Sequence, residues 1–195
     1  MCCDDSAHCE NEAMSDATVR RELRPGDLGA ILEHHGRVYA REHGVDSSFE
    51  AHVAATLANA ALRGFPQPNE AIWIVGHDGV HAGSFALTDS EDGVACARWF
   101  LLDPAVRGRG LGRQLVDELV AAAEEAGYER IVLETFSDLR AAAHLYRSRG
   151  FRATSAETGP RWGRAEITYQ SYELELPADP CEHAVSRERA TKPIV

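Results

Sequence analysis

A strand, a glycine-rich loop and a helix follow one another within residues 94–126, and this junction constrains the fold most. The strand-like run 94–102 ends at Asp103-Pro104, and glycines stand at 108, 110 and 112, where apolar residues at helical spacing begin. Glycines let backbone N–H groups converge without obstruction by side chains. The first turn of a helix adds unpartnered N–H donors and the positive end of the helix dipole. The junction therefore predicts a phosphate-binding site.

The loop differs from two common phosphate-binding motifs. No Lys-Ser or Lys-Thr follows the glycines, as a P-loop requires, and the third glycine is misplaced for the dinucleotide fingerprint. The loop instead resembles the Arg/Gln-x-x-Gly-x-Gly/Ala signature of the GNAT superfamily of N-acetyltransferases. The matching residues are Arg107, Gly108, Arg109, Gly110, Leu111 and Gly112, with Arg113 directly after them.

The resemblance implies that these backbone amides bind the pyrophosphate of acetyl-CoA, the cosubstrate. It also implies that the strand ending at 102 pairs with the pantetheine arm. Backbone amides near Leu101 and Leu102 are expected to stabilise the oxyanion. Many members carry an asparagine at the position of Leu139, and Ser137 or water is expected to replace its hydrogen bonds.

A second motif supports the resemblance. The family usually has Leu-Tyr-x-x-x-Gly-Phe after the next strand, and residues 145–151 read Leu-Tyr-Arg-Ser-Arg-Gly-Phe. The similarity extends over most of residues 18–176. Segments 39–44 and 46–50 also resemble the acetyltransferase domains fused to MarR-type regulators in some bacteria.

Two residues are candidates for proton transfer. The resemblance implies that Tyr146 protonates the departing CoA thiolate; the alternative is a buried tyrosine of the core. Glu134, on the strand before it, matches the general base of some members, and a solvated strand carboxylate is an equal alternative. His34, His35 and His81 are further candidates for the base. His35 falls on the apolar face of the first expected helix, where a packed histidine is more common than a catalytic one.

The elements expected along the chain have the order β-α-α-β-β-β-α-β-α-β-β. Hairpins come first and a β-α-β crossover follows, so we expect an α/β fold of the GNAT type with a mixed central sheet. Ser47 and Glu50 match a capping box for the second helix. The segment 155–166 is expected to be a loop, and the resemblance to the GNAT superfamily implies that this loop and the first two helices shape the acceptor pocket.

The ends of the chain set the expected domain limits. Residues 1–16 are expected to be a disordered acidic leader, 17–177 the acetyltransferase domain and 178–195 a flexible tail. The leader holds Cys2, Cys3, His8 and Cys9, whose spacing matches no usual zinc pattern, so no metal site is expected.

Composition excludes several classes of protein. The net charge is −11, which argues against a nucleic-acid binder, and no apolar run approaches the length of a membrane span. Without a signal peptide, a cytoplasmic protein is expected. The sequence thus predicts an acetyl-CoA-dependent N-acetyltransferase acting on a small-molecule or peptide amine by direct transfer, and a homodimer is an open alternative. Two alternative functions remain open: a non-catalytic acyl-CoA-binding module, and transfer of an acyl group larger than acetyl.

Overall fold

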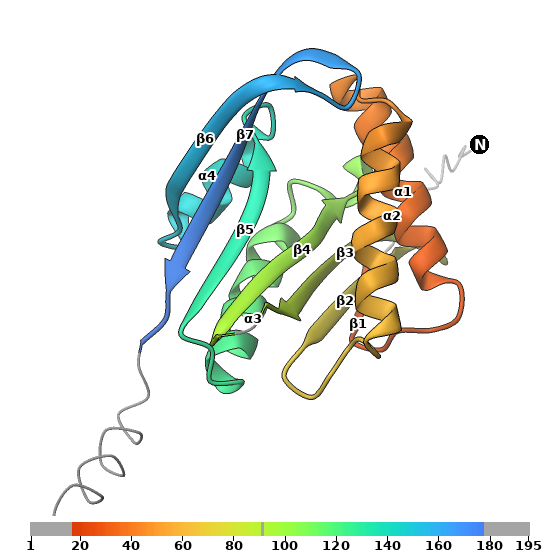
Figure 1. Ribbon diagram of the computed structural model, residues 1–195. Helices are drawn as coiled ribbons and strands as arrows, with labels where there is room; N and C mark the ends of the chain where they lie inside the picture. The colour runs from red at the N-terminus through yellow and green to blue at the C-terminus, as the bar shows by residue number, and fades with distance from the viewer. Residues whose placement is uncertain (1–16, 91, 178–195) are drawn as a thin grey trace, which may run out of the picture.

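Seven strands form one mixed sheet in the order β1-β2-β3-β4-β5-β7-β6, as Figure 1 shows. The computed structural model describes residues 17–90 and 92–177. All neighbouring strands are antiparallel except β4 and β5, which are parallel and joined through a helix. The strands are β1 (Thr18–Arg20), β2 (Ala71–His77), β3 (Val80–Asp89), β4 (Val94–Leu102), β5 (Arg130–Phe136), β6 (Arg152–Arg161) and β7 (Arg164–Glu175).

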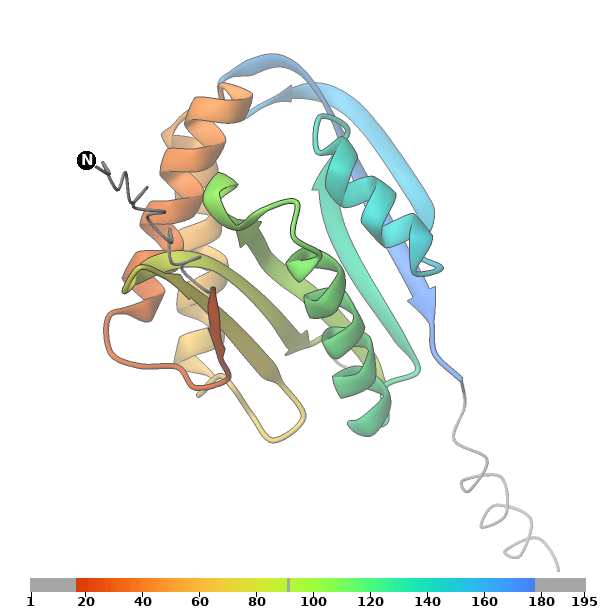
Figure 2. The same cartoon turned by 180° about the vertical axis from the view of Figure 1, so that it is seen from behind.

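Two pairs of helices cover the two faces of this sheet. Helices α1 (Asp27–His43) and α2 (Ser47–Leu62) lie on one face, while α3 (Leu111–Glu125) and α4 (Arg140–Ser148) lie on the other (Figures 1 and 2). Each face has its own apolar core: Leu115 and Leu119 of α3 pack on one side, and Ile31 and Val38 of α1 on the other. The element order, the mixed sheet and the α/β class agree with the sequence prediction.

Two local predictions were wrong. Helix α2 is capped by Asp46, whose carboxylate accepts from the N–H of Ser48 (2.9 Å), so Ser47 and Glu50 form no capping box. Segment 155–166 is not a loop, because β6 and β7 continue through it to a tight turn at Trp162 and Gly163, both with positive φ. The N–H of Asp46 donates to the carbonyl of Trp162 (2.9 Å), which ties this hairpin to the start of α2.

Strand β4 contains the irregularity that creates the site. Ala86 pairs with Arg98 and Ser84 with Leu101, so β4 has one residue more than β3 between these pairs, and Trp99 has φ of 51°. This is a β-bulge. The ladder between β4 and β5 ends at the pair Ala97–Leu133, and beyond it the strands diverge (Figure 1).

The predicted terminal segments, 1–16 and 178–195, lie outside the described residues, so the domain limits stay a prediction. Within residues 17–90 and 92–177, no helix is long and apolar enough to cross a membrane.

Candidate active site

A cavity of about 470 Å³ occupies the space where β4 and β5 diverge. Its lining comes from both faces of the sheet: Tyr39 and Phe49 of α1 and α2 on one side, Leu145 and Tyr146 of α4 on the other. The glycine-rich loop, through Gly108, also contributes to the lining. The cavity therefore connects the two faces of the sheet and can hold a ligand that passes between the strands.

The glycine-rich loop carries a row of backbone donors. Gly108 and Gly110 have φ of 77° and 84°, which favour glycine, and Gly110 caps α3 without a side-chain hydrogen bond. Among the described residues, the N–H groups from Gly108 to Arg113 have no hydrogen-bond acceptor. Six unpartnered donors at the N-terminus of a 15-residue helix form a suitable anion site, as the sequence predicts.

Arg107 holds this loop in place. Its Nε donates to the carbonyl of Leu102 (2.7 Å) and its guanidinium pairs with Glu42 of α1 at 2.9 Å. The side chain therefore joins the loop to the opposite helix layer across the end of β4. Arg109 and Arg113 are exposed beside the loop and make no ion pair with a described residue.

The end of β4 presents one of the two predicted amides to the cavity side. The N–H of Asp103 donates to Ala82 on β3 (2.7 Å), while the carbonyl of Leu102 accepts from Arg107 on the other side. Because successive strand residues direct their backbone groups to opposite edges, the N–H of Leu102 points away from β3 and that of Leu101 toward it. Leu102 is thus the better placed of the two to donate to a ligand between β4 and β5.

Tyr146 lies on α4 against the diverging strands. It is 5% exposed, its ring packs near Phe100 and Phe151, and burial raises the pKa of its hydroxyl. The hydroxyl makes no hydrogen bond within the described part of the chain. A phenol that keeps its proton at neutral pH and has no internal partner is a proton donor available to a ligand.

Thr135 is a polar group of the lining that the sequence did not single out. Its Oγ1 is buried without a hydrogen-bond partner among the described residues, and the cost of such burial calls for a ligand or water. Thr135 and Leu139 both line the cavity, whereas Ser137 does not and donates to Asp138 (3.4 Å). Alternation along β5 points Thr135 to the α4 face, which is the side of Tyr146.

Glu134 lies on the opposite face of β5, toward α2. It lines the cavity, and its Oε2 accepts a hydrogen bond from the hydroxyl of Tyr169 (2.7 Å). Burial and this contact with a carboxylate raise the pKa of Tyr169, so its hydroxyl stays a donor. The two predicted catalytic residues, Tyr146 and Glu134, therefore border one cavity from opposite sides of the sheet.

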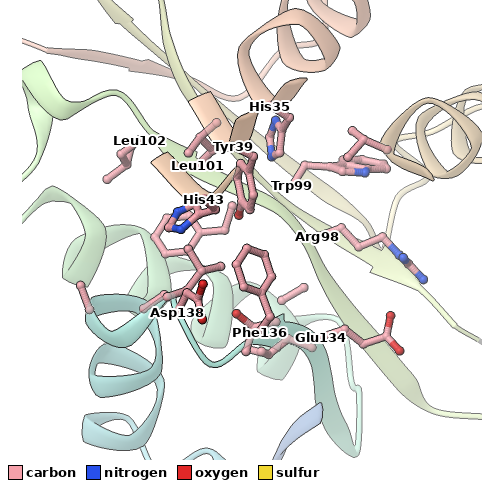
Figure 3. A pocket seen from close by; sticks show the side chains of 18 of the residues that line it. His35, Tyr39, His43, Arg98, Trp99, Leu101, Leu102, Glu134, Phe136 and Asp138 are labelled. Carbon is pink, nitrogen blue, oxygen red and sulfur yellow. The ribbon is translucent and has the colours of Figure 1, made fainter. Parts of the chain in front are cut away.

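Aromatic side chains surround the α1–α2 side of the cavity, and sequence reasoning missed most of them. The ring of Tyr39 stacks on that of Phe49 (4.5 Å between centroids), and the ring centroids of Phe136 and Trp162 lie 6.0 Å apart. Tyr39 and Phe136 can be seen in Figure 3. Burial raises the pKa of Tyr39 to about 12. Trp162 reaches this wall because the β6–β7 hairpin extends to α2, a long-range contact that has no local sequence signal.

The three candidate histidines separate into two places. His35 lines the cavity and its Nδ1 lies 2.8 Å from the carbonyl of Ile31, which assigns the proton to Nδ1. His34 and His81 lie outside the lining, with ring centroids 5.2 Å apart. His34 Nε2 is 3.4 Å from Asp103 but lacks hydrogen-bond geometry. Burial lowers the pKa of His34, and lowers that of His35 and of His81 to about 4.

These neutral histidines predict an acid-sensitive fold. Between pH 6.5 and 4 the unfolded chain binds protons that the folded chain does not, so the free energy of unfolding falls as the pH falls. For His35 alone, the free energy of unfolding is expected to fall by about 2 kcal/mol between pH 7 and pH 5. Urea unfolding at both pH values measures this fall, and it should be smaller in His35→Leu. An equal fall in that variant would contradict a neutral His35 in the folded protein.

Several known proteins are similar to this chain in sequence. The sequence model of the acetyltransferase (GNAT) family matches residues 39–151, more than half of the chain. The uncharacterised N-acetyltransferase YjgM of Escherichia coli K12 is 32% identical over 144 residues, which cover 72% of this chain and 86% of YjgM. The L-amino acid N-acyltransferase MnaT of the same strain is 28% identical over 170 residues, or 82% of this chain and 96% of MnaT.

Solved structures share the fold. The structure of YncA from Salmonella typhimurium, which contains its cofactor acetyl-CoA, has a TM-score of 0.64 and 23% identity, and the match covers 84% of this chain and 96% of YncA. The matched family segment includes the glycine-rich loop, both diverging strands and Tyr146. On this evidence the chain belongs to the GNAT family of acetyltransferases.

Proposed function

We propose that this protein transfers the acetyl group of acetyl-CoA to an amine, with both substrates bound at once. The observation that carries the proposal is the cavity through the sheet, which extends from Gly108 and Gly112 of the loop with unpartnered N–H groups to the wall that holds Glu134. Acetyl-CoA bound in the structure of YncA, a protein of the same fold, supports the choice of donor.

The residues fit such a donor at two points. The N–H groups from Gly108 to Arg113 suit a pyrophosphate, with Arg109 and Arg113 adding positive charge. The buried Oγ1 of Thr135, which lacks a partner among the described residues, suits an amide of an extended arm between the strands. Acetyl-CoA supplies the activated acetyl group as a thioester; the rest of the chemistry falls to the chain.

Three groups of the chain act on the transfer. The N–H of Leu102 donates to the thioester oxygen, where negative charge develops as the amine attacks. Glu134 accepts the proton that the ammonium must lose before attack, directly or through water. The hydroxyl of Tyr146 donates its proton to the departing sulfur as the C–S bond breaks, because a thiol is a better leaving group than a thiolate. The nitrogen, cationic after its attack, loses its second proton to water, and Tyr146 regains a proton from the solvent.

Cys96 lines the same cavity, yet its environment does not suit a covalent carrier. Burial raises the pKa of its thiol, so little thiolate is available for attack. Direct transfer from donor to amine is therefore favoured over an acetylated enzyme.

A panel of amines tests the proposal. We expect acetyl-CoA to yield free CoA and an acetylated amine with at least one member, detected by mass spectrometry. Propionyl-CoA and longer acyl-CoAs in the same assay define the acyl group. Tight binding of acetyl-CoA without any acetylated product would instead indicate a non-catalytic acyl-CoA-binding module.

Glu134→Gln tests the general base. Glutamine cannot accept a proton, so at pH 7 we expect activity to fall by roughly 10²-fold. The deficit should shrink as the pH approaches the pKa of the amine, since more of the acceptor then arrives unprotonated. The measurement is the pH profile of kcat/KM.

The matched control is Glu175→Gln, an exposed carboxylate of the sheet that does not line the cavity. This control should keep the parental profile. A Glu134→Gln profile that also matches the parent would return Glu134 to the role of a surface carboxylate.

A further inference from the structure

The acidic side chains that line the cavity all have partners. Glu42 pairs with Arg107 at 2.9 Å, Asp138 pairs with Arg164, and Glu134 accepts from Tyr169. The contact with Arg164 also lowers the pKa of Asp138. Each acidic side chain of the lining therefore already has an ion-pair or hydrogen-bond partner within the protein.

Two arginines of the lining differ from these acids. Within residues 17–90 and 92–177, neither Arg98 nor Arg140 makes an ion pair or a hydrogen bond through its guanidinium. Arg140 begins α4 and is exposed on the cofactor side of the sheet. Arg98 is half-buried on β4, on the side where the acceptor is expected.

Strand alternation sets the direction of Arg98. Ala97 packs in the core on the α3–α4 face, so Arg98 lies on the opposite face with its pairing partner Ala86. The extra residue of the β-bulge adds Trp99 to that same face. Since Ala97 pairs with Leu133, Arg98 and Glu134 are neighbours on parallel strands, and Figure 3 shows both side chains extending toward the same side.

Arg98 and Glu134 also share a neighbour. Both charges act on Tyr169, so the guanidinium and the carboxylate lie within electrostatic reach of one phenol. No ion pair joins the two side chains themselves. Arg98 lines the cavity and also borders a second hollow of about 320 Å³ together with Thr56 and Arg63.

A half-buried guanidinium without a counter-ion is suited to a carboxylate, which it binds through two parallel hydrogen bonds. Glu134, of opposite charge, suits an ammonium group. The aromatic side chains of Phe49, Phe136 and Trp162 border the same side and favour an apolar substituent. A cation, an anion and an apolar wall together match the three parts of an amino acid.

We propose that Arg98 binds the carboxylate of the acceptor, and that the acceptor is a free α-amino acid with an apolar side chain. This inference rests on the proposed function, since it assigns the amine to Glu134. It adds a binding residue and a substrate class, and it excludes amines that lack a neighbouring carboxylate as preferred acceptors.

The test compares acceptors that differ only in the carboxylate. L-leucine, L-methionine and L-phenylalanine are assayed beside their amides and their decarboxylated amines, with the parent protein and Arg98→Gln. We expect Arg98→Gln to lower kcat/KM for the best amino acid by roughly 10- to 10²-fold. For the amides and amines we expect little change, and Arg98→Lys should retain part of the activity with the amino acid.

Two controls separate this inference from the proposed function. Arg152→Gln removes an exposed arginine of β6 outside the cavity and should change nothing. The dissociation constant of acetyl-CoA should be the same in Arg98→Gln and the parent. If no amine, amide or amino acid is acetylated, the proposed function fails.

Binding gives a readout that does not need turnover. Calorimetric titration of the three amino acids into the protein saturated with CoA should show binding by the parent that Arg98→Gln loses. The inference is overturned if none of the three binds, if the decarboxylated amine binds as tightly, or if Arg98→Gln weakens all acceptors equally.

Discussion

Replacing Tyr146 by phenylalanine is expected to lower kcat by roughly 10²–10⁴-fold, the range for loss of a positioned acid. The ring and its packing remain, and the hydroxyl has no hydrogen bond to lose within the described residues. Stability should therefore be unchanged. The dissociation constant of acetyl-CoA should also be nearly unchanged, because the proton is needed only as charge develops on sulfur.

Tyr172→Phe provides the matched control for this variant. Tyr172 is also buried, its ring centroid lies 6.3 Å from that of Tyr146, and its hydroxyl accepts from Arg147 (2.7 Å). It does not line the cavity. We expect this control to lose about 1 kcal/mol of stability and to keep kcat. Full turnover by Tyr146→Phe would make Tyr146 a core residue and water the proton source.

Replacing Gly110 by aspartate is expected to weaken acetyl-CoA binding by roughly 10- to 10³-fold. The introduced carboxylate would repel the negatively charged pyrophosphate at close range. A steric clash within the protein is not the cause of this loss, since a Cβ added at Gly110 meets no atom within 4 Å. The φ of 84° adds a backbone cost of about 1 kcal/mol, which lowers stability but not affinity. Calorimetry with acetyl-CoA measures the affinity.

The same helix supplies the control for this prediction. Gly127, at the other end of α3, has φ of 77° and equally open space around its Cα. Gly127→Asp therefore adds the same side chain to a similar backbone conformation, far from the loop. It should lose stability and keep the affinity for acetyl-CoA. Parental affinity in a folded Gly110→Asp protein would place the pyrophosphate elsewhere.

The local features of the sequence predicted the fold well. The bounds of β4 agree with the prediction to the residue, because the apolar run there ends at a clear turn signal. The cap of α2 was misassigned because Asp46 and Ser47 are adjacent and either can cap a helix. The two closing strands were predicted, but the continuation of β6 and β7 through residues 155–166 was missed because the residues of β6 are mostly exposed and carry little periodicity.

The site could be predicted only where it is local in sequence. The glycine-rich loop and Tyr146 lie in short motifs, and the structure places Tyr146, Glu134 and part of the loop at one cavity. Long-range geometry determines the rest: Arg107 meets Glu42 from another helix layer, and Trp162 reaches the cavity through a hairpin that contacts the start of α2. Neither contact leaves a pattern within a single element.

The most direct test of direct transfer is the initial-velocity pattern with acetyl-CoA and the best acceptor varied together, alongside the intact mass of the protein. Simultaneous binding in one cavity predicts reciprocal plots that converge, and a protein whose mass is unchanged after incubation with acetyl-CoA alone. Parallel plots together with a protein heavier by one acetyl group would contradict this account, because they would show that the acetyl group first passes to the enzyme.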